Sequence, residues 1–122
     1  LGRAGLGTVD DLDGVEVHDC FAASGYAAID HLGITAPGDS WKAIEAGELE
    51  RDGRLPVNPG GGLIGGGHPV GASGVRMVLD GARQVTGRAG PTQVAGARRF
   101  GTLNIGGSTA TTCSFVVEAV AS

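Results

Sequence analysis

The stretch GVEVHDCFAASGYAAIDHLG, residues 14–33, changes its hydrophobic period in the middle. Up to His18, valines alternate with polar side chains, which is typical of a short strand. From Asp19 onward the apolar residues recur at helical spacing, and Gly33 is suited to end a helix. The stretch therefore predicts a strand that runs directly into a helix, with His18, Asp19 and Cys20 at the junction.

A second helical period covers residues 72–87. Its apolar stripe is expected to face the core and consists of Val75, Val78, Leu79, Ala82 and Val85. Two strands follow at 99–105 and 109–120, joined by a Gly-Gly-Ser turn. The irregular stretch 34–58, with one short helix at 41–47, is interpreted as an excursion on the surface. The order strand, helix, helix, strand, strand predicts an α/β fold, in which helices cover a mixed sheet.

Composition narrows the class of protein. The chain has 122 residues, enough for one domain spanning 1–122, and its 24 glycines far exceed average usage. A net charge of −4 with Lys42 as its single lysine argues against a nucleic-acid partner or a polybasic membrane patch. No segment has the apolar length of a membrane span, and the first residues do not resemble a signal peptide. We expect a reducing, cytoplasmic location.

The stretch GGGLIGGGHPVGASG, residues 60–74, surrounds His68 and Pro69 with glycines. A tight surface turn is the simpler interpretation, but a turn needs only one or two glycines. A glycine run lets the backbone approach a ligand closely while one imidazole projects toward it. The string at 60–65 also matches G-x-G-x-x-G by chance, because no clean strand precedes it and no helix is predicted at its end. His68 is therefore a candidate base or oxyanion donor.

The other candidate side chains are ambiguous when each is taken alone. Cys20 after a strand is more often a core residue than a reactive thiol, and a half-buried strand histidine such as His18 is common. Cys113 shares an apolar face with Phe115 and Val117 and is predicted to pack in the core. The spacing of these residues predicts neither a disulfide framework nor a metal site. Packing or surface roles are expected for Tyr26, His31 and Trp41.

Three ordered segments together resemble a known family. They are VEVHDCFA, LPVNPGGGLIGGGHPVGASG and LNIGGSTATTCSFVVEAV. This series is similar to the carboxy-terminal domain of thiolases, in particular the sterol-carrier-protein-2 type, over nearly the whole chain. Most thiolases have N-E-A-F in the first motif, whereas this chain has His18-Asp19-Cys20-Phe21, the sterol-carrier pattern. The second motif is Gly67-His68-Pro69, and in the third Asn104 occupies the place of the usual cysteine.

The resemblance implies a role for each site residue. His68 would deprotonate a nucleophilic cysteine and then help to bind the thioester oxyanion. Cys20 would take over the acid/base work of the missing third-motif cysteine, and His18 would contribute to the oxyanion pocket directly or through a water. The expected substrates are coenzyme A thioesters, with no permanently bound cofactor and no metal. Residues expected to hold the thioester and its pantetheine arm are Asn58, Gly60, Gly61, Gly67, Asn104 and Gly106.

The resemblance also implies a partner. The thiolase nucleophile lies on an amino-terminal domain, and neither Cys20 nor Cys113 resembles that motif. The family's carboxy-terminal domain begins with a strand and most of a helix before the position of Leu1, so we expect a fragment or subunit that is inactive alone and works in a homo-oligomer. Three alternatives stay open: a thiolase-like aldolase acting on sterol side-chain thioesters with a partner protein, a non-catalytic acyl-CoA or lipid-binding module, and an oligomerisation domain.

Overall fold

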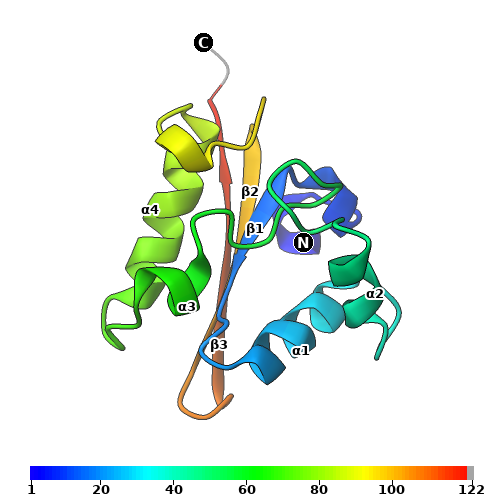
Figure 1. The fold of residues 1–122 in the computed structure, drawn as a ribbon. Coiled ribbons are helices and arrows are strands. Elements are labelled where there is room, and N and C mark those ends of the chain that lie inside the picture. Colours follow the sequence, from blue (N-terminus) through cyan, green and yellow to red (C-terminus); the bar gives the residue numbers. More distant parts are fainter. Residues whose placement is uncertain (121–122) are drawn as a thin grey trace.

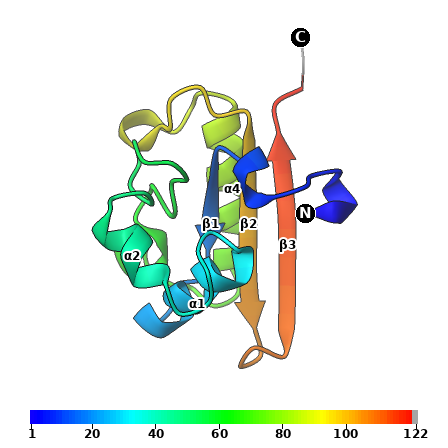
Figure 2. The same cartoon turned by 90° about the vertical axis from the view of Figure 1, so that its right-hand side faces the viewer.

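The computed structural model describes residues 1–120, which form a mixed three-stranded sheet. The strands are β1 (Gly14–Val17), β2 (Arg99–Gly106) and β3 (Thr111–Glu118), in the order β1-β2-β3. β1 and β2 are parallel, whereas β2 and β3 form an antiparallel hairpin (Figure 2). A parallel pair needs a long crossover, and the segment between β1 and β2 provides it with all four α-helices.

Helices cover both faces of the sheet (Figure 1). α4 (Ser73–Val85) lies on one face, and α1 (Ala22–Leu32) and α2 (Ser40–Glu45) lie on the other. A fourth short helix, α3 (Gly62–Gly66), and three 3-10 turns at Gly2–Ala4, Val9–Asp11 and Gly90–Thr92 complete the fold. The predicted α/β architecture, a mixed sheet covered by helices, is confirmed. No helix among residues 1–120 is both long and apolar enough to cross a bilayer.

The alternation of β1 divides the core into two parts. Val15 and Val17 face the α1 side, where they join Ile29 and Leu103 in one apolar cluster. Phe100 on β2 faces the α4 side and is fully buried with Val85. A Cβ at Gly14 would collide with the Phe100 ring, so β1 can pass this ring only as glycine.

The predicted core stripe of α4 is wrong at two of its five positions. Val75 is 74% exposed and Leu79 is 47% exposed. The buried positions of the helix are instead Ser73, Met77, Gly81, Gln84 and Val85. At Gly81 this buried face lies against Phe100 and Val117 of the sheet, and Val75 and Leu79 lie on the outward side. α4 therefore presents an unpartnered apolar face.

The prediction that Cys113 packs in the core is also wrong. Cys113 is exposed, and Phe115 beside it is 53% exposed. Both lie on β3, which pairs with β2 along one edge and forms the border of the described sheet. Of the predicted apolar face, Val117 packs against the cluster around Phe100.

Residues 34–58 are more than a surface excursion. Ile34 and Leu55 are buried in the cluster around Val15. The end of this segment forms an isolated parallel bridge from Val57 to Val15, on the edge of β1 that β2 does not use. The bridge ties the start of the glycine-rich stretch to β1. This connection positions the candidate site.

Candidate functional site

Two histidines from distant segments meet at the end of β1. His18 directly follows the strand and is buried, whereas His68 follows α3 in the glycine-rich stretch and is exposed. Their ring centroids are 4.9 Å apart and their planes are inclined at 85°. Edge-to-face contact of this kind holds two rings in a defined mutual orientation. The structure thus brings together two of the three predicted catalytic residues.

His18 is held by β2. Its backbone N–H donates to the carbonyl of Leu103 at 3.0 Å, and its Nδ1 lies 2.7 Å from Oδ1 of Asn104. Because a carboxamide oxygen only accepts, Nδ1 carries the proton in this pair. Neutral imidazole has a single N–H, so Nε2 is left with a free lone pair. Asn104, predicted as a ligand-binding residue, sets the tautomer of His18.

His68 is oriented by the first residue of α4. Its Nδ1 lies 2.7 Å from Oγ of Ser73, and the same hydroxyl donates to the carbonyl of Pro69 at 3.1 Å. A hydroxyl has one proton to donate, so Ser73 accepts from Nδ1 of His68. Nε2 of His68 therefore has an available lone pair, as a general base requires. Ser73 was not among the predicted site residues, although its position five residues after His68 allows this contact.

Asn58 anchors the glycine-rich stretch to β1. Its Oδ1 accepts from the N–H of Val17 at 2.7 Å, and its Nδ2 donates to the carbonyl of Val17 at 3.2 Å. The residue adopts a left-handed conformation with a φ of 51°, which asparagine tolerates better than most residues. Both polar atoms of its side chain are therefore engaged by the strand that leads to His18.

Asp19 holds α3 and was missed by the sequence interpretation. Its Oδ1 accepts the N–H of Leu63 at 2.7 Å, near the start of the helix. Gly62 lies directly against this carboxylate, and a Cβ there would also be 2.6 Å from Nδ2 of Asn58. The sequence predicted no helix in this region, because a glycine-rich five-residue helix has little intrinsic propensity. An acidic residue next to a candidate histidine was the available signal.

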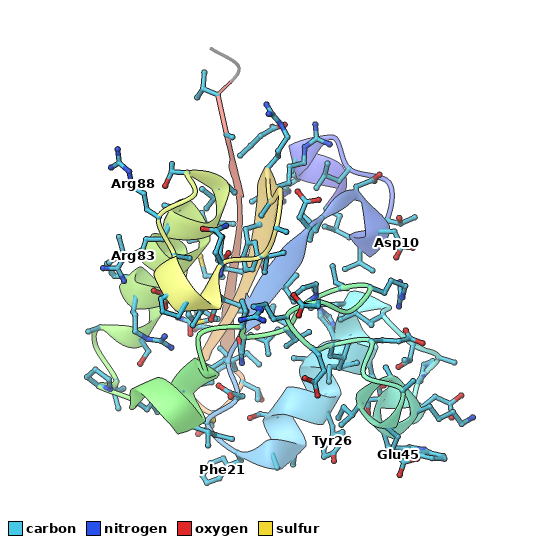
Figure 3. The ribbon with its side chains drawn as sticks, turned by 45° about the horizontal axis from the view of Figure 1, so that its top comes forward. Asp10, Phe21, Tyr26, Glu45, Arg83 and Arg88 are labelled. Carbon is cyan, nitrogen blue, oxygen red and sulfur yellow. The ribbon has the colours of Figure 1, made fainter. Side chains whose placement is uncertain are left out.

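Cys20 lies along the chain between His18 and the first helix, α1. α1 begins at Ala22 with Phe21 as its N-cap, so Cys20 precedes the helix, at the predicted junction. The thiol is half-buried, and its sulfur lies 3.6 Å from Oγ of Ser24. Phe21 itself projects outward (Figure 3). Along the chain, Cys20 follows His18 by two residues.

The predicted ligand-binding glycines lie around this arrangement. Gly60 and Gly61 are exposed ahead of α3, and Gly67 is exposed between α3 and His68 with a φ of 84°. Gly106 is the last residue of β2, two positions after Asn104. Gly67 is thus adjacent to His68 along the chain, and Gly106 lies on the strand whose Asn104 holds His18.

Three features lie outside the pair of histidines. Among the described residues, no cluster of three or more His, Cys, Asp or Glu side chains is placed to hold a metal ion. A hollow of about 560 Å³ lies elsewhere, between the amino-terminal segment, α1 and β3, and its lining includes His31 but neither His18 nor His68. Tyr26 and Trp41 lie exposed on α1 and α2 as surface residues.

Comparison with known proteins gives a consistent result. Residues 1–119 match the family described as thiolase C-terminal domain-like. The chain is 46% identical over 101 residues to the acetyl-CoA acetyltransferase of Methanothermobacter thermautotrophicus, covering 83% of this chain. It is 38% identical over 96 residues to sterol carrier protein 2 of Bos taurus, covering 79% of this chain. A solved Ltp2-ChsH2(DUF35) aldolase shares the fold, with a TM-score of 0.81 over 97% of this chain at 24% identity.

The matched region is a small part of each of these proteins. It spans 26% of the acetyltransferase, 18% of the bovine sterol carrier protein 2 and 29% of the aldolase chain.

Proposed function

The chain belongs to the thiolase family as a thiolase C-terminal domain, and from this premise we propose that it supplies the acid/base groups of an acyl-CoA acyltransferase. The reaction is thiolytic cleavage of a 3-ketoacyl-CoA, or its reverse, the Claisen condensation of two acyl-CoA molecules. The observation that carries the proposal is the pair of imidazoles, His18 and His68, each held at Nδ1 with Nε2 free.

His68 acts as the base. Its free Nε2 takes the proton from the nucleophilic cysteine of a thiolase N-terminal domain, and the resulting thiolate attacks the 3-keto carbon. The bond between C2 and C3 of the substrate then breaks, which leaves an acyl group on that cysteine. Ser73 supports this role because its acceptor oxygen keeps the proton on Nδ1. Once protonated at Nε2, His68 has a donor for the thioester oxyanion.

His18 stabilises the oxyanion through a water molecule. Its proton is on Nδ1, bound to Asn104, so neutral His18 has no N–H at Nε2 to donate directly. A water that donates to Nε2 still has a second O–H, which can donate to the oxyanion. This geometry favours the water-mediated route over the direct contact.

Cys20 completes the proton transfer. When the C2–C3 bond breaks, the carbanion at C2 takes the proton of the Cys20 thiol, which releases acetyl-CoA. Coenzyme A then attacks the acyl group on the nucleophilic cysteine, and its thiol proton returns to Cys20. The cysteine thiolate that leaves takes its proton back from His68. The half-buried thiol lies at the end of the strand that delivers His18, which supports its access to the same substrate.

The thioester is held by backbone more than by side chains. Gly60, Gly61 and Gly67 leave the peptide groups around His68 accessible, and Gly106 does the same at the end of β2. Asn58 and Asn104 act by fixing this backbone and the tautomer of His18, since their amides are engaged at 2.7 Å by Val17 and His18.

The partner is a thiolase N-terminal domain, on the same polypeptide or on a separate subunit, which brings the nucleophilic cysteine. The outward apolar face of α4, with Val75 and Leu79, is the surface that it covers. The matched region makes up 26% of the related acetyltransferase, which supports a partner of this kind. The isolated chain is accordingly inactive in acyl transfer.

The test is thiolysis of acetoacetyl-CoA by the full-length protein and two variants. We expect His68→Ala to lower kcat by about 10²-fold to 10⁴-fold, the contribution of a positioned general base. His31→Ala, which changes an exposed histidine on α1, is the matched control and retains activity. Unchanged turnover in His68→Ala would contradict the proposal.

The same preparations separate the alternative functions. An acyl-CoA-binding module would bind the thioester equally well with or without His68 and turn none over. An aldolase would cleave a hydroxylated side-chain thioester without consuming free coenzyme A. Turnover by the isolated 122-residue chain would contradict the need for a partner domain.

A further inference from the structure

A polar cavity lies behind the glycine-rich stretch. It has a volume of about 250 Å³ and lies between β1, Gly60 and the inner side of α4. Its charged lining consists of Glu16 from β1 and Arg76, Asp80 and Arg83 from α4. The neutral lining includes Gln84 and Thr92. None of these side chains has a place in the proposed reaction.

Glu16 is the most unusual group in this cavity. Its side chain is 1% exposed, and both carboxyl oxygens lack a hydrogen-bond partner among the described residues. Burial raises the pKa of Glu16 to about 8, with nearby Asp80 and Asp19 adding to the rise and Arg76 opposing it. At neutral pH the group is therefore a buried neutral acid, which has one proton to donate.

Arg76 has complementary unpaired groups. Its Nη1 donates to Oδ2 of Asp80 at 2.7 Å, but its Nε and Nη2 are buried without a partner among the described residues. Each unpaired buried donor costs about 1–3 kcal/mol. A cavity of about 250 Å³ far exceeds the roughly 30 Å³ that one water occupies in the liquid, and water settles where two to four polar partners converge. Four unpaired polar atoms supply those partners.

The guanidinium also lies near the segment that carries His68. A Cβ placed on Gly66 would lie 3.4 Å from Nη1 of Arg76, so the side chain of Arg76 fills the space next to this glycine. Gly66 is the last residue of α3, two positions before His68. On the other side of the cavity, Glu16 is two positions before His18 on the same strand.

We propose that Glu16 and Arg76 are positioning residues, joined by ordered water in this cavity into a bridge that holds the backbone of His68 against the strand that carries His18. The protonated Glu16 donates to a water, and Nε and Nη2 of Arg76 donate to the same cluster. Ionised Glu16 attracts the guanidinium toward the strand and away from Gly66. The bridge itself does not depend on the reaction proposed above, which enters only in giving His68 a catalytic role.

The first measurement is a crystal structure of the full-length protein at pH 6.5. We expect ordered waters within hydrogen-bond distance of the Glu16 carboxyl and of Nε or Nη2 of Arg76. A cavity that is dry, or filled by a direct contact between the two side chains, would overturn the proposal. This measurement needs no variant that must fold and no turnover.

The second measurement follows the His68 ring by NMR through a pH titration of histidine-labelled protein. The wild-type curve should contain a second inflection near pH 8, the value to which burial raises the pKa of Glu16. Glu16→Gln should abolish that inflection, because glutamine mimics the neutral acid without titrating. Arg76→Lys should weaken the inflection, because a point charge lacks the planar fork.

Arg83→Lys is the matched control. Arg83 lines the same cavity and lies 3.4 Å from Oδ1 of Asp80, but its side chain is half-exposed and projects outward (Figure 3). The substitution Arg83→Lys should leave the inflection near pH 8 in place. Equal curves for the wild type and Glu16→Gln would show that Glu16 does not act on His68 and would overturn the proposal. If the wild-type protein shows the inflection near pH 8 but does not catalyse thiolysis, only the proposed function is contradicted.

Discussion

The rings of His18 and His68 meet edge to face, with 4.9 Å between their centroids. Each ring is bound at Nδ1 by a different acceptor, Asn104 for the first and Ser73 for the second. The contact thus joins two segments that are far apart along the chain and leaves both Nε2 atoms free. This arrangement makes specific demands on the residues that support it.

Ser73→Ala should release the His68 ring from its tautomer. Loss of the acceptor at Nδ1 lets the proton occupy either ring nitrogen, so the fraction with a free Nε2 falls. We expect ¹⁵N NMR to change from an Nδ1–H pattern to a mixture, and kcat to drop at least about tenfold, since a positioned base contributes about 10²-fold to 10⁴-fold. Ser108→Ala, in the exposed β2–β3 turn, is the control. An unchanged ¹⁵N pattern would show that Ser73 does not set the tautomer.

Gly62→Ala should disturb the start of α3. Its Cβ would collide with the Asp19 carboxylate, and its φ of 60° is unfavourable for alanine. We expect a loss of about 1–3 kcal/mol in the free energy of unfolding, measured by urea denaturation. Gly65→Ala in the same helix is the matched control, because nothing lies within 4 Å of its Cβ. It should be neutral or stabilising by up to about 1 kcal/mol. Equal effects of the two changes would contradict the contact with Asp19.

Glu16→Gln should stabilise the protein in a pH-dependent way. Burial raises the Glu16 pKa from 4.5 to about 8, so the folded state holds a proton that the unfolded state releases between these values. The stability that this proton confers is complete below pH 4.5 and falls as pH rises to 8, by about 1.4 kcal/mol per pH unit. Glutamine has no such dependence.

The difference in unfolding free energy between Glu16→Gln and wild type should therefore be near zero at pH 4 and about 3 kcal/mol in favour of the variant at pH 7. Urea denaturation at a series of pH values measures it. Glu45→Gln, at the exposed end of α2, is the control for replacing a carboxyl group by an amide. A constant offset for Glu16→Gln would mean that Glu16 is ionised in the folded protein.

Leu79→Glu should separate folding from association. Leu79 is 47% exposed on α4, so the isolated chain should lose no more than about 0.5 kcal/mol. Binding to a separately produced thiolase N-terminal domain, measured by calorimetry, should weaken at least about tenfold, because a charge would enter an apolar contact. Met77→Ala on the opposite face is the contrasting variant, with an expected loss of about 2–5 kcal/mol in stability. Unimpaired binding by Leu79→Glu would place the partner elsewhere.

Local pattern was enough to predict several elements of this protein. The change of period between Val17 and Ala22 predicted β1 and α1, and the alternation after Arg99 predicted the β2–β3 hairpin, because backbone geometry repeats every two residues in a strand and every 3.6 in a helix. The motifs around His18 and His68 also predicted the family. These signals lie in neighbouring residues and need no knowledge of the fold.

Which face of an element is buried depended on its neighbours. The valine and leucine stripe of α4 predicted a core face at Val75 and Leu79. The buried face instead runs through Met77 and Gly81, because the side of a helix that is buried is the side on which the sheet lies. Cys113 is exposed for a related reason, because β3 borders the described sheet.

The sequence by itself determined the order of strands and helices, the family and the identity of His18 and His68 as candidate residues. Only the tertiary structure decided that these rings touch, that Asn104 and Ser73 set their tautomers, and that Asp19 holds α3. Only the tertiary structure decided that Glu16 is buried as well. Local conformation follows from interactions a few residues apart, whereas hydrogen bonds and burial between distant segments exist only after the sheet has paired and the helices have packed on it.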